Sequence, residues 1–277
     1  MILVTGATGN IGGALLTQLH AHGAGPLRGL TRAAARADLP RGVTAVEGDL
    51  AEPATWPAAL DGVRSLFLVP GLGPEADLLD AARRAGVEHV VLVSSITVQT
   101  HPHLGPAAGN LAVERLLQGS GMAWTILRPT QFASNTLLWA TTIREHGTVR
   151  APYADTALPT IHPADIASVA RLALTEPGHR SQTYALTGPA PVTARQQVAA
   201  IGAALGREVP FEQVSREQAR PWMVAVFGAD AADAVLDVTG GDVNADLARV
   251  RDTVPRLTGA PARTVRQWVT ENVAAFR

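Results

Sequence analysis

The sequence of 277 residues contains no cysteine and no lysine, so all 23 residues of its Lys+Arg count are arginines. Without cysteine there are no disulfides, no thiolate nucleophiles and no cysteine-bound metals. Without lysine there is no Walker-type phosphate lysine, no Schiff-base lysine and no catalytic Tyr–Lys pair. An alanine- and arginine-rich composition is also typical of GC-rich coding, which accounts for the missing lysines at surface positions. The chemical exclusions hold in either case.

The sequence also lacks a strong charge of either sign and any long apolar run. The formal net charge of −1 argues against nucleic acid or an anionic membrane as an obligate partner. No segment approaches the roughly 18 apolar residues of a membrane span. An apolar strand at residue 2 leaves no room for a signal peptide, so we expect a cytoplasmic protein. Hydrophobic residues make up 47% of the chain, enough for a sizeable core.

A glycine-rich turn dominates the first thirteen residues. Ile2–Val4 is a short apolar run that predicts a strand buried on both faces. Gly6, Gly9 and Gly12 follow, and apolar residues then recur at helical spacing from Ile11 to Leu19. A strand, a glycine turn and a helix in this order form a cradle for dinucleotide phosphates, because the helix N-terminus points free N–H groups at the anion. The alternative, a tight turn without a ligand, is weaker.

Strand and helix patterns then alternate along the first half of the chain. We expect strands near 27–30, 43–46, 63–69, 87–93 and 124–127, helices near 53–60, 75–85 and 110–118, and a loop over 97–109. This alternation predicts an α/β fold with a doubly wound parallel Rossmann sheet over residues 1–146. Residues 147–277 predict a smaller α+β substrate or lid domain, with strands that can return to the Rossmann sheet.

The second strand ends at Thr31-Arg32, where this fold selects its cofactor. An acidic residue there binds the ribose 2′-OH of NAD, whereas an arginine pairs with the 2′-phosphate of NADP. Arg32 therefore favours NADP(H). After the third strand, Asp49 either accepts a hydrogen bond from adenine, with Leu50 covering the ring, or caps the following helix.

Polar side chains after the fifth strand are candidates for the reacting centre. Ser94 and Ser95 lie at its carboxyl end, where open parallel sheets bind ligands. Ser95 either faces the substrate or satisfies loop backbone. His101 and His103 have no third ligand close in sequence, so we predict no metal site. His162 and Tyr153 belong to a region that can face the cleft, although a structural role is favoured for both.

Several motifs, in the right order over almost the whole chain, resemble the NmrA-like branch of atypical short-chain dehydrogenases/reductases. They are Val4–Gly12, Arg32, Gly48–Leu50, Val93–Ser95, Glu114, Thr125–Pro129, Phe132, Asn135, Asp165–Ala167, Tyr184–Gly188, Trp268 and Phe276. The resemblance implies an NADP(H)-binding Rossmann domain with a small C-terminal substrate domain. Members of the family either reduce quinones, dyes and other conjugated carbonyl compounds or bind the dinucleotide without turning it over.

The resemblance also implies positions for the cofactor. Its contacts would be Gly6, Thr8, Gly9, Asn10, Ile11 and Gly12 at the pyrophosphate, Arg32 at the 2′-phosphate, Asp49 and Leu50 at the adenine, Leu68, Val69, Pro70 and Ser94 at the nicotinamide, and Pro129 and Phe132 closing over it.

The chain departs from the family at the acid–base pair. Gln99 stands where ordinary members have the tyrosine, and Asn110 stands where they have the lysine. An alternative alignment of the tyrosine falls on Pro106. A tyrosine acid with a lysine-lowered pKa is therefore excluded.

We therefore predict an NADPH-dependent reductase of a small conjugated substrate, quinonoid or aromatic, in which Ser95 or Asn110 donates to the substrate oxygen. The reduced form of such a substrate is a stabilised anion that takes its proton from water. Two alternatives remain open: a non-catalytic NADP(H) sensor, and a tailoring reductase of a bacterial aromatic metabolite. The sequence does not indicate an oligomeric state.

Overall fold

The structure is a computed structural model that describes residues 1–71 and 73–277. Its strands are β1 (Ile2–Val4), β2 (Leu27–Thr31), β3 (Thr44–Glu47), β4 (Ser65–Leu68), β5 (His89–Val93), β6 (Ala123–Pro129), β7 (Val149–Ala151), β8 (Ala157–Pro159), β9 (Gln182–Leu186), β10 (Pro191–Thr193) and β11 (Phe211–Gln213). Its α-helices are α1 (Asn10–Ala21), α2 (Trp56–Leu60), α3 (Glu75–Arg84), α4 (Thr97–Thr100), α5 (Gly105–Gly119), α6 (Ala140–His146), α7 (Pro163–Thr175), α8 (Ala194–Leu205), α9 (Arg216–Phe227), α10 (Ala229–Leu236), α11 (Thr253–Thr258) and α12 (Val265–Glu271).

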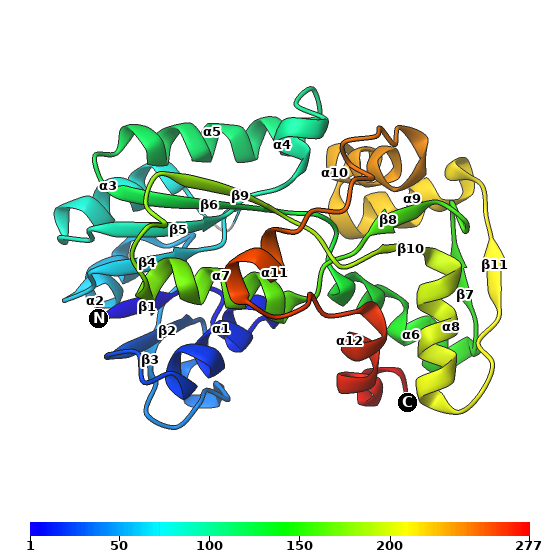
Figure 1. Ribbon diagram of the computed structural model, residues 1–277, viewed down its shortest axis with the longest axis horizontal. Coiled ribbons are helices and arrows are strands. Elements are labelled where there is room, and N and C mark those ends of the chain that lie inside the picture. The colour runs from blue at the N-terminus through cyan, green and yellow to red at the C-terminus, as the bar shows by residue number, and fades with distance from the viewer. Residues whose placement is uncertain (72) are drawn as a thin grey trace.

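A seven-stranded sheet in the order β3-β2-β1-β4-β5-β6-β9 forms the centre of the larger unit. Every neighbouring pair in it is parallel. The central strands β1, β4 and β5 read as nearly continuous apolar runs because helices cover both faces. Figure 1 shows α3 and α5 on one face and α1 and α7 on the other. The order reverses between β1 and β4, which is the switch point where this fold binds ligands. The predicted doubly wound Rossmann sheet is confirmed.

Each helical layer has its own core against the sheet. Leu78 of α3 and Leu117 of α5 pack on one side, and Leu16 of α1 and Ile166 of α7 pack on the other. The stripes that these residues form every three or four positions are what makes each segment a helix in this context.

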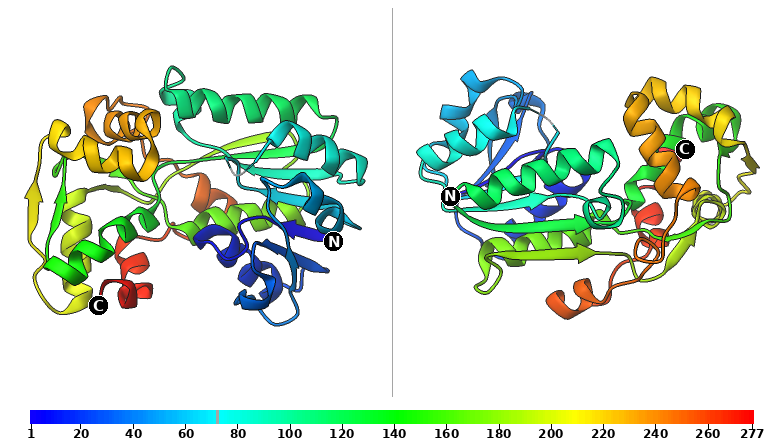
Figure 2. Two further views of the ribbon diagram at one scale, coloured as in Figure 1. Left: turned by 180° about the vertical axis from the view of Figure 1, so that it is seen from behind. Right: turned by 90° about the horizontal axis from the view of Figure 1, so that it is seen from above.

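The smaller unit lies beyond the carboxyl ends of the strands (Figures 1 and 2). It contains two small sheets, β8 with β10 and β7 with β11. Its core joins α6, α8 and α12, and a second cluster joins α9 and α10. α7 and β9, which lie beyond residue 146, belong to the larger unit. Residues 133–146, which precede that point, pack in the smaller one.

The structure corrects one sequence expectation and adds two helices that were not predicted. The segment 97–109 is not a loop, since α4 occupies Thr97–Thr100 and α5 already begins at Gly105. Pro106 lies in the first turn of α5, where a missing N–H costs nothing. The helices α9 and α10 were not predicted, and they form one wall of the cavity described below. Of the helices in the described part of the chain, none is both long and apolar enough to span a bilayer.

Candidate active site

The turn after β1 brings backbone against backbone at distances that only glycine allows. Gly6 has a φ of +59°, in the left-handed region. A Cβ on Gly12 would lie 2.2 Å from the carbonyl oxygen of Gly6, so α1 reaches the turn only because Gly12 has no side chain. Thr8, Gly9 and Asn10 are exposed. The result is an open backbone cradle at the positive end of α1.

Arg32 follows β2 directly and is exposed. It forms no ion pair with any residue that the structure describes. Arg28, by contrast, donates to the carbonyl oxygens of Ala59 and Asp61 at 2.8 and 2.9 Å. Arg32 is therefore the guanidinium at this strand end that is open to a ligand anion.

Asp49 and Leu50, which follow β3 after Gly48, both interact with other parts of the protein. Asp49 accepts a hydrogen bond of 2.9 Å from the backbone N–H of Ala51, which satisfies the start of the turn that leads to α2. Leu50 is only 6% exposed and packs in the core with Trp56. The alternative to adenine binding, that Asp49 caps the following helix, is wrong: the N-cap positions there are Glu52 and Thr55. The second carboxylate oxygen of Asp49 has no hydrogen bond to a described residue.

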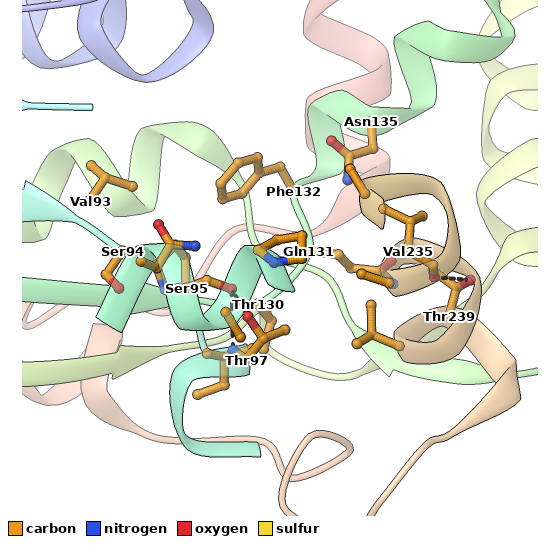
Figure 3. Close-up of a pocket in the computed structure, with 18 of the residues that line it drawn as sticks. Val93, Ser94, Ser95, Thr97, Thr130, Gln131, Phe132, Asn135, Val235 and Thr239 are labelled. Atoms are coloured by element: carbon orange, nitrogen blue, oxygen red, sulfur yellow. Dashed lines mark hydrogen bonds between the residues drawn. The ribbon is translucent and has the colours of Figure 1, made fainter. Parts of the chain in front are cut away.

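A cavity of about 750 Å³ lies between the carboxyl edge of the sheet and the smaller unit. Its sheet side is formed by residues at the ends of three strands and on α5, namely Val69, Pro70, Val93, Ser94, Ser95, Pro106, Asn110, Pro129, Thr130, Gln131 and Phe132. Its far side comes from α9, α10 and their neighbours, including Phe227, Val235, Val238, Thr239 and Leu247. In Figure 3, Ser94 and Ser95 lie on one side, Val235 and Thr239 on the other, and Gln131 and Phe132 between them.

The cavity brings together part of the predicted site. Asn10, Val69, Pro70, Ser94, Ser95, Asn110, Pro129 and Phe132 line it. The remaining turn residues, together with Arg32 and Asp49, lie along the same carboxyl edge outside it. Leu68 is fully buried in the sheet core and is not among the lining residues. The far-side residues were not predicted, because the helices α9 and α10, which carry most of them, were not recognised in the sequence.

A buried ion pair lies behind Ser94. The Ser94 hydroxyl donates to Glu114 Oε1 at 2.5 Å. Arg128 then holds the same carboxylate through both of its oxygens, at 2.9 Å from Nε and 2.5 Å from Nη2. Glu114 is 1% exposed, and the pair satisfies its charge inside the protein. The Ser94 oxygen is thereby fixed at the cavity wall.

The two residues predicted to donate to the substrate, Ser95 and Asn110, differ in the hydrogen bonds that they form within the protein. Ser95 Oγ lies 2.8 Å from Thr97 Oγ1 and accepts from the Thr97 N–H at 3.2 Å. It therefore satisfies loop backbone while also lining the cavity. The Asn110 side chain forms no hydrogen bond with any described residue, and its amide is available to a ligand.

Neither the residue at the family's tyrosine position nor the two tyrosines of this chain provides a general acid at the cavity. Gln99 is exposed and donates to Asp246 at 3.0 Å. Tyr184 pairs with His179 at 2.9 Å. Both tyrosines are among the described residues, and neither lines this cavity.

His162 has a structural place outside the cavity. It caps α7 by accepting from the Ala164 N–H at 3.0 Å, and its Nε2 lies 3.2 Å from the Glu271 carboxylate. Burial lowers the pKa of His162 more than Glu271 raises it. The His162 ring also packs edge-on against Trp268 of α12, with 5.4 Å between the ring centres, so it joins α12 to α7 and does not line the cavity.

Known proteins share this architecture. A family described as NAD(P)H-binding matches residues 6–177. The chain is 38% identical to the (4-alkanoyl-5-oxo-2,5-dihydrofuran-3-yl)methyl phosphate reductase of Streptomyces griseus, over 100% of this chain and 99% of that one. It is 39% identical to the NAD(P)H azoreductase of Xenophilus azovorans, with the same coverage. The NADPH-dependent quinone oxidoreductase of Escherichia coli, solved in complex with NADPH, superposes with a TM-score of 0.80 at 28% identity, over 98% of this chain and 99% of that one.

Proposed function

The chain belongs to the NmrA-like branch of the atypical short-chain dehydrogenases/reductases, a NAD(P)H-binding family of oxidoreductases, and we propose that it is an NADPH-dependent reductase of conjugated, quinonoid or aromatic acceptors. The observation that carries the proposal is the apolar cavity of about 750 Å³ at the carboxyl edge of the sheet, beside the glycine cradle.

The cradle fits a dinucleotide. A side chain at Gly12 would fill the space against Gly6, and the exposed turn leaves backbone N–H groups at the start of α1 open to an anion. We assign the pyrophosphate to Thr8–Ile11 and the 2′-phosphate to Arg32, because no acid stands at the end of β2 to repel it. Asp49 and Leu50 are assigned to the adenine.

The nicotinamide end is assigned to the sheet side of the cavity. Val69, Pro70 and Ser94 would hold the ring there, and Pro129 and Phe132 would close over it. The bound cofactor supplies the hydride, which is chemistry that the protein itself does not carry. The protein orients the acceptor and excludes water with the apolar side chains of α10.

The lining limits which acceptors can react. An isolated ketone needs an acid for its developing alkoxide, and losing that acid costs a factor of about 10² to 10⁴ in rate. The chain offers no lysine, and Ser94 donates its proton to Glu114. A quinone or extended enone yields a stabilised anion and can take its proton from water. The cavity therefore favours conjugated acceptors.

Asn110 and Ser95 are assigned the polar contacts to the acceptor. The Asn110 amide donates a hydrogen bond to the substrate oxygen, and Ser95 is the secondary donor because Thr97 already engages its hydroxyl. The names of the relatives agree with this class, since they specify an azoreductase, a quinone oxidoreductase and a dihydrofuranone reductase.

The test measures the oxidation of NADPH by 1,4-benzoquinone and by an azo dye, with the loss of NADPH absorbance as the readout. We expect oxidation with at least one of these acceptors and none with a saturated ketone. Tight NADPH binding with no oxidation by any conjugated acceptor would instead indicate a redox sensor. An absence of NADPH binding by calorimetry would overturn the cofactor assignment as well.

A further inference from the structure

A second, smaller cavity adjoins the first one. Its volume is about 130 Å³. The two cavities share lining residues, among them Phe132, Leu138 and Phe227. We call the smaller one the side chamber. Because the same side chains form walls of both, the two cavities lie next to each other.

Aromatic side chains gather in the side chamber although the chain has few of them. Aromatic residues make up 4% of the sequence. Two of the five tryptophans, one of the two tyrosines and two of the five phenylalanines line the chamber, namely Trp139, Trp222, Tyr153, Phe132 and Phe227. A cavity of about 150 Å³ in a protein core holds one benzene molecule, so the side chamber has room for a single ring. Aromatic walls favour a flat ring through stacked or edge contacts.

Three large apolar side chains that line the side chamber are exposed. Leu138, Trp222 and Phe227 are 52%, 40% and 36% exposed, and all three line it. Large apolar side chains that stay exposed together are typical of a ligand-binding surface rather than of a folded core.

Tyr153 is held in place against its backbone preference. Its φ is +56°, which is strained for an aromatic residue. Its ring packs so closely on Gly240 that a Cβ there would lie 2.1 Å from the ring. Arg216 donates to the Tyr153 hydroxyl at 3.5 Å and to Asp237 at 2.6 Å. The surrounding structure thus fixes this wall of the chamber.

One largely buried polar side chain lines the chamber without a hydrogen bond to any described residue. Gln197 of α8 is only 7% exposed, and its amide forms no hydrogen bond with any residue that the structure describes. The neighbouring Gln196 has a structural task, since its amide oxygen accepts from the Thr193 N–H at 2.9 Å. The Gln197 amide atoms are accessible in the chamber although the residue is largely buried, so a ligand with a hydrogen-bonding group could bond to them without breaking a hydrogen bond within the described protein.

We propose that the side chamber is a subsite for the distal ring of an elongated acceptor, a ring that carries a carbonyl, carboxamide or hydroxyl group for Gln197. Gln197 is then a specificity residue: it selects the far end of the substrate while the conjugated centre reacts in the main cavity. This inference rests on the proposed function only in assigning the reacting end to the main cavity.

The test compares three acceptors that differ at one end: 1,4-benzoquinone, phenyl-1,4-benzoquinone and its para-carboxamide. In the natural protein we expect the carboxamide to have the lowest KM. Gln197→Leu should raise that KM by about three- to tenfold, the value of one hydrogen bond, and leave kcat/KM for benzoquinone unchanged. Gln118→Leu, at an exposed position of α5, is the matched control and should change none of the three.

Two further measurements separate a failure of the subsite from a failure of the proposed function. Biphenyl-4-carboxamide is not reduced, so its binding can be measured whether or not any quinone turns over. With NADP⁺ bound to both proteins, it should bind the natural protein more tightly than it binds the Gln197→Leu variant, by the same factor. The thermal midpoint of Gln197→Leu should stay equal to that of the natural protein, because the amide forms no hydrogen bond with a described residue. A fall in the midpoint, or an equal loss with all three quinones, would identify Gln197 as structural and overturn the proposal. Equal affinity of both proteins for the biphenyl amide would overturn it as well.

Discussion

Ser94 Oγ and Glu114 Oε1 lie 2.5 Å apart, which joins the wall of the cavity to a buried carboxylate on α5. Since the serine proton points at Glu114, the oxygen that Ser94 presents to the cavity can only accept a hydrogen bond. Arg128 fixes the carboxylate from the neighbouring strand β6. The position of Ser94 therefore depends on a charge pair that does not itself line the cavity.

We expect Glu114→Gln to destabilise the protein and weaken NADPH binding together. Removing one partner of a buried pair leaves the other charge uncompensated, and because Arg128 is 19% exposed the loss should be about 2 kcal/mol, below the full range for such pairs. Denaturant unfolding and calorimetric titration with NADPH measure the two effects. Glu88→Gln, which breaks the exposed pair with Arg64, should leave both unchanged. A stable variant with unaltered NADPH affinity would show that Ser94 does not need Glu114.

Gly12→Ala should abolish or strongly weaken dinucleotide binding, whereas Gly13→Ala should not. The added Cβ at Gly12 meets the Gly6 carbonyl at 2.2 Å, while that at Gly13 meets the nearest oxygen, that of Ala7, at an ordinary 3.5 Å. Overpacking of this kind costs about 1–3 kcal/mol and moves α1 away from the turn. Thermal unfolding and NADPH titration of both variants provide the comparison. Equal affinities in the two variants would contradict the cradle.

Arg32→Ala should lose the preference for NADPH over NADH. A charge-assisted hydrogen bond to the 2′-phosphate is worth about 1.5–3 kcal/mol, so the Kd for NADPH should rise by about 10- to 100-fold and that for NADH should not change. Arg36→Ala is the matched control, an exposed arginine four residues further on. If Arg36→Ala gives the larger loss, the 2′-phosphate site has been assigned to the wrong arginine.

The sheet half of the site could be predicted from the sequence, and the opposite wall could not. The glycine turn and the apolar strands are local patterns, and the order of the strands places Ser94 and Pro129 at one edge. Phe227 and Val235 reach the same cavity from α9 and α10, which the periodicity did not indicate. Pro221 inside α9 interrupts its pattern, and the two helices pack mainly on each other and on Tyr153 rather than on the large core.

The loop wrongly predicted at 97–109 has a related cause. Its two prolines and two glycines are typical of a turn-rich segment, but a proline in the first helical turn replaces an N–H that has no partner there anyway. As a result α5 starts five residues before Asn110 and carries it into the cavity. The composition of the segment thus led to the prediction of a loop where the structure has helices. The prediction that Asn110 belongs to the site depended only on its resemblance to the family.

Asn110→Ala should lower kcat/KM for a quinone by about tenfold, the value of one hydrogen bond of about 1.4 kcal/mol. Ser95→Ala should cost less, because Thr97 already engages the serine hydroxyl. Steady-state kinetics at saturating NADPH test both, with the Kd for NADPH as the control that the cofactor site is intact. A larger effect at Ser95 than at Asn110 would exchange the two roles.

The stability of the protein should fall between pH 7 and pH 5 because of a histidine far from the cavity. His89 is 5% exposed at the start of β5, and its Nε2 donates to Thr125 Oγ1 at 3.0 Å, since that hydroxyl donates its own proton to the His179 carbonyl at 2.8 Å. Burial, with Arg180 and His179 adding to it, lowers the pKa of His89 to about 4.

The sign follows from linkage. Between the folded pKa of about 4 and the unfolded value of 6.5, the unfolded chain binds more protons than the folded protein. The free energy of unfolding therefore rises with pH across that window, and the His89 contribution to it is lost as the pH falls through the window. From pH 7 to pH 5 the His89 contribution decreases by about 2 kcal/mol. His89→Gln keeps a donor for Thr125 but cannot titrate, so denaturant unfolding at the two pH values should show a smaller difference than in the natural protein. His162, whose pKa burial also lowers, leaves a residual slope of the same sign in the variant. An unchanged pH dependence in His89→Gln would mean that His89 is protonated in the folded protein at pH 5.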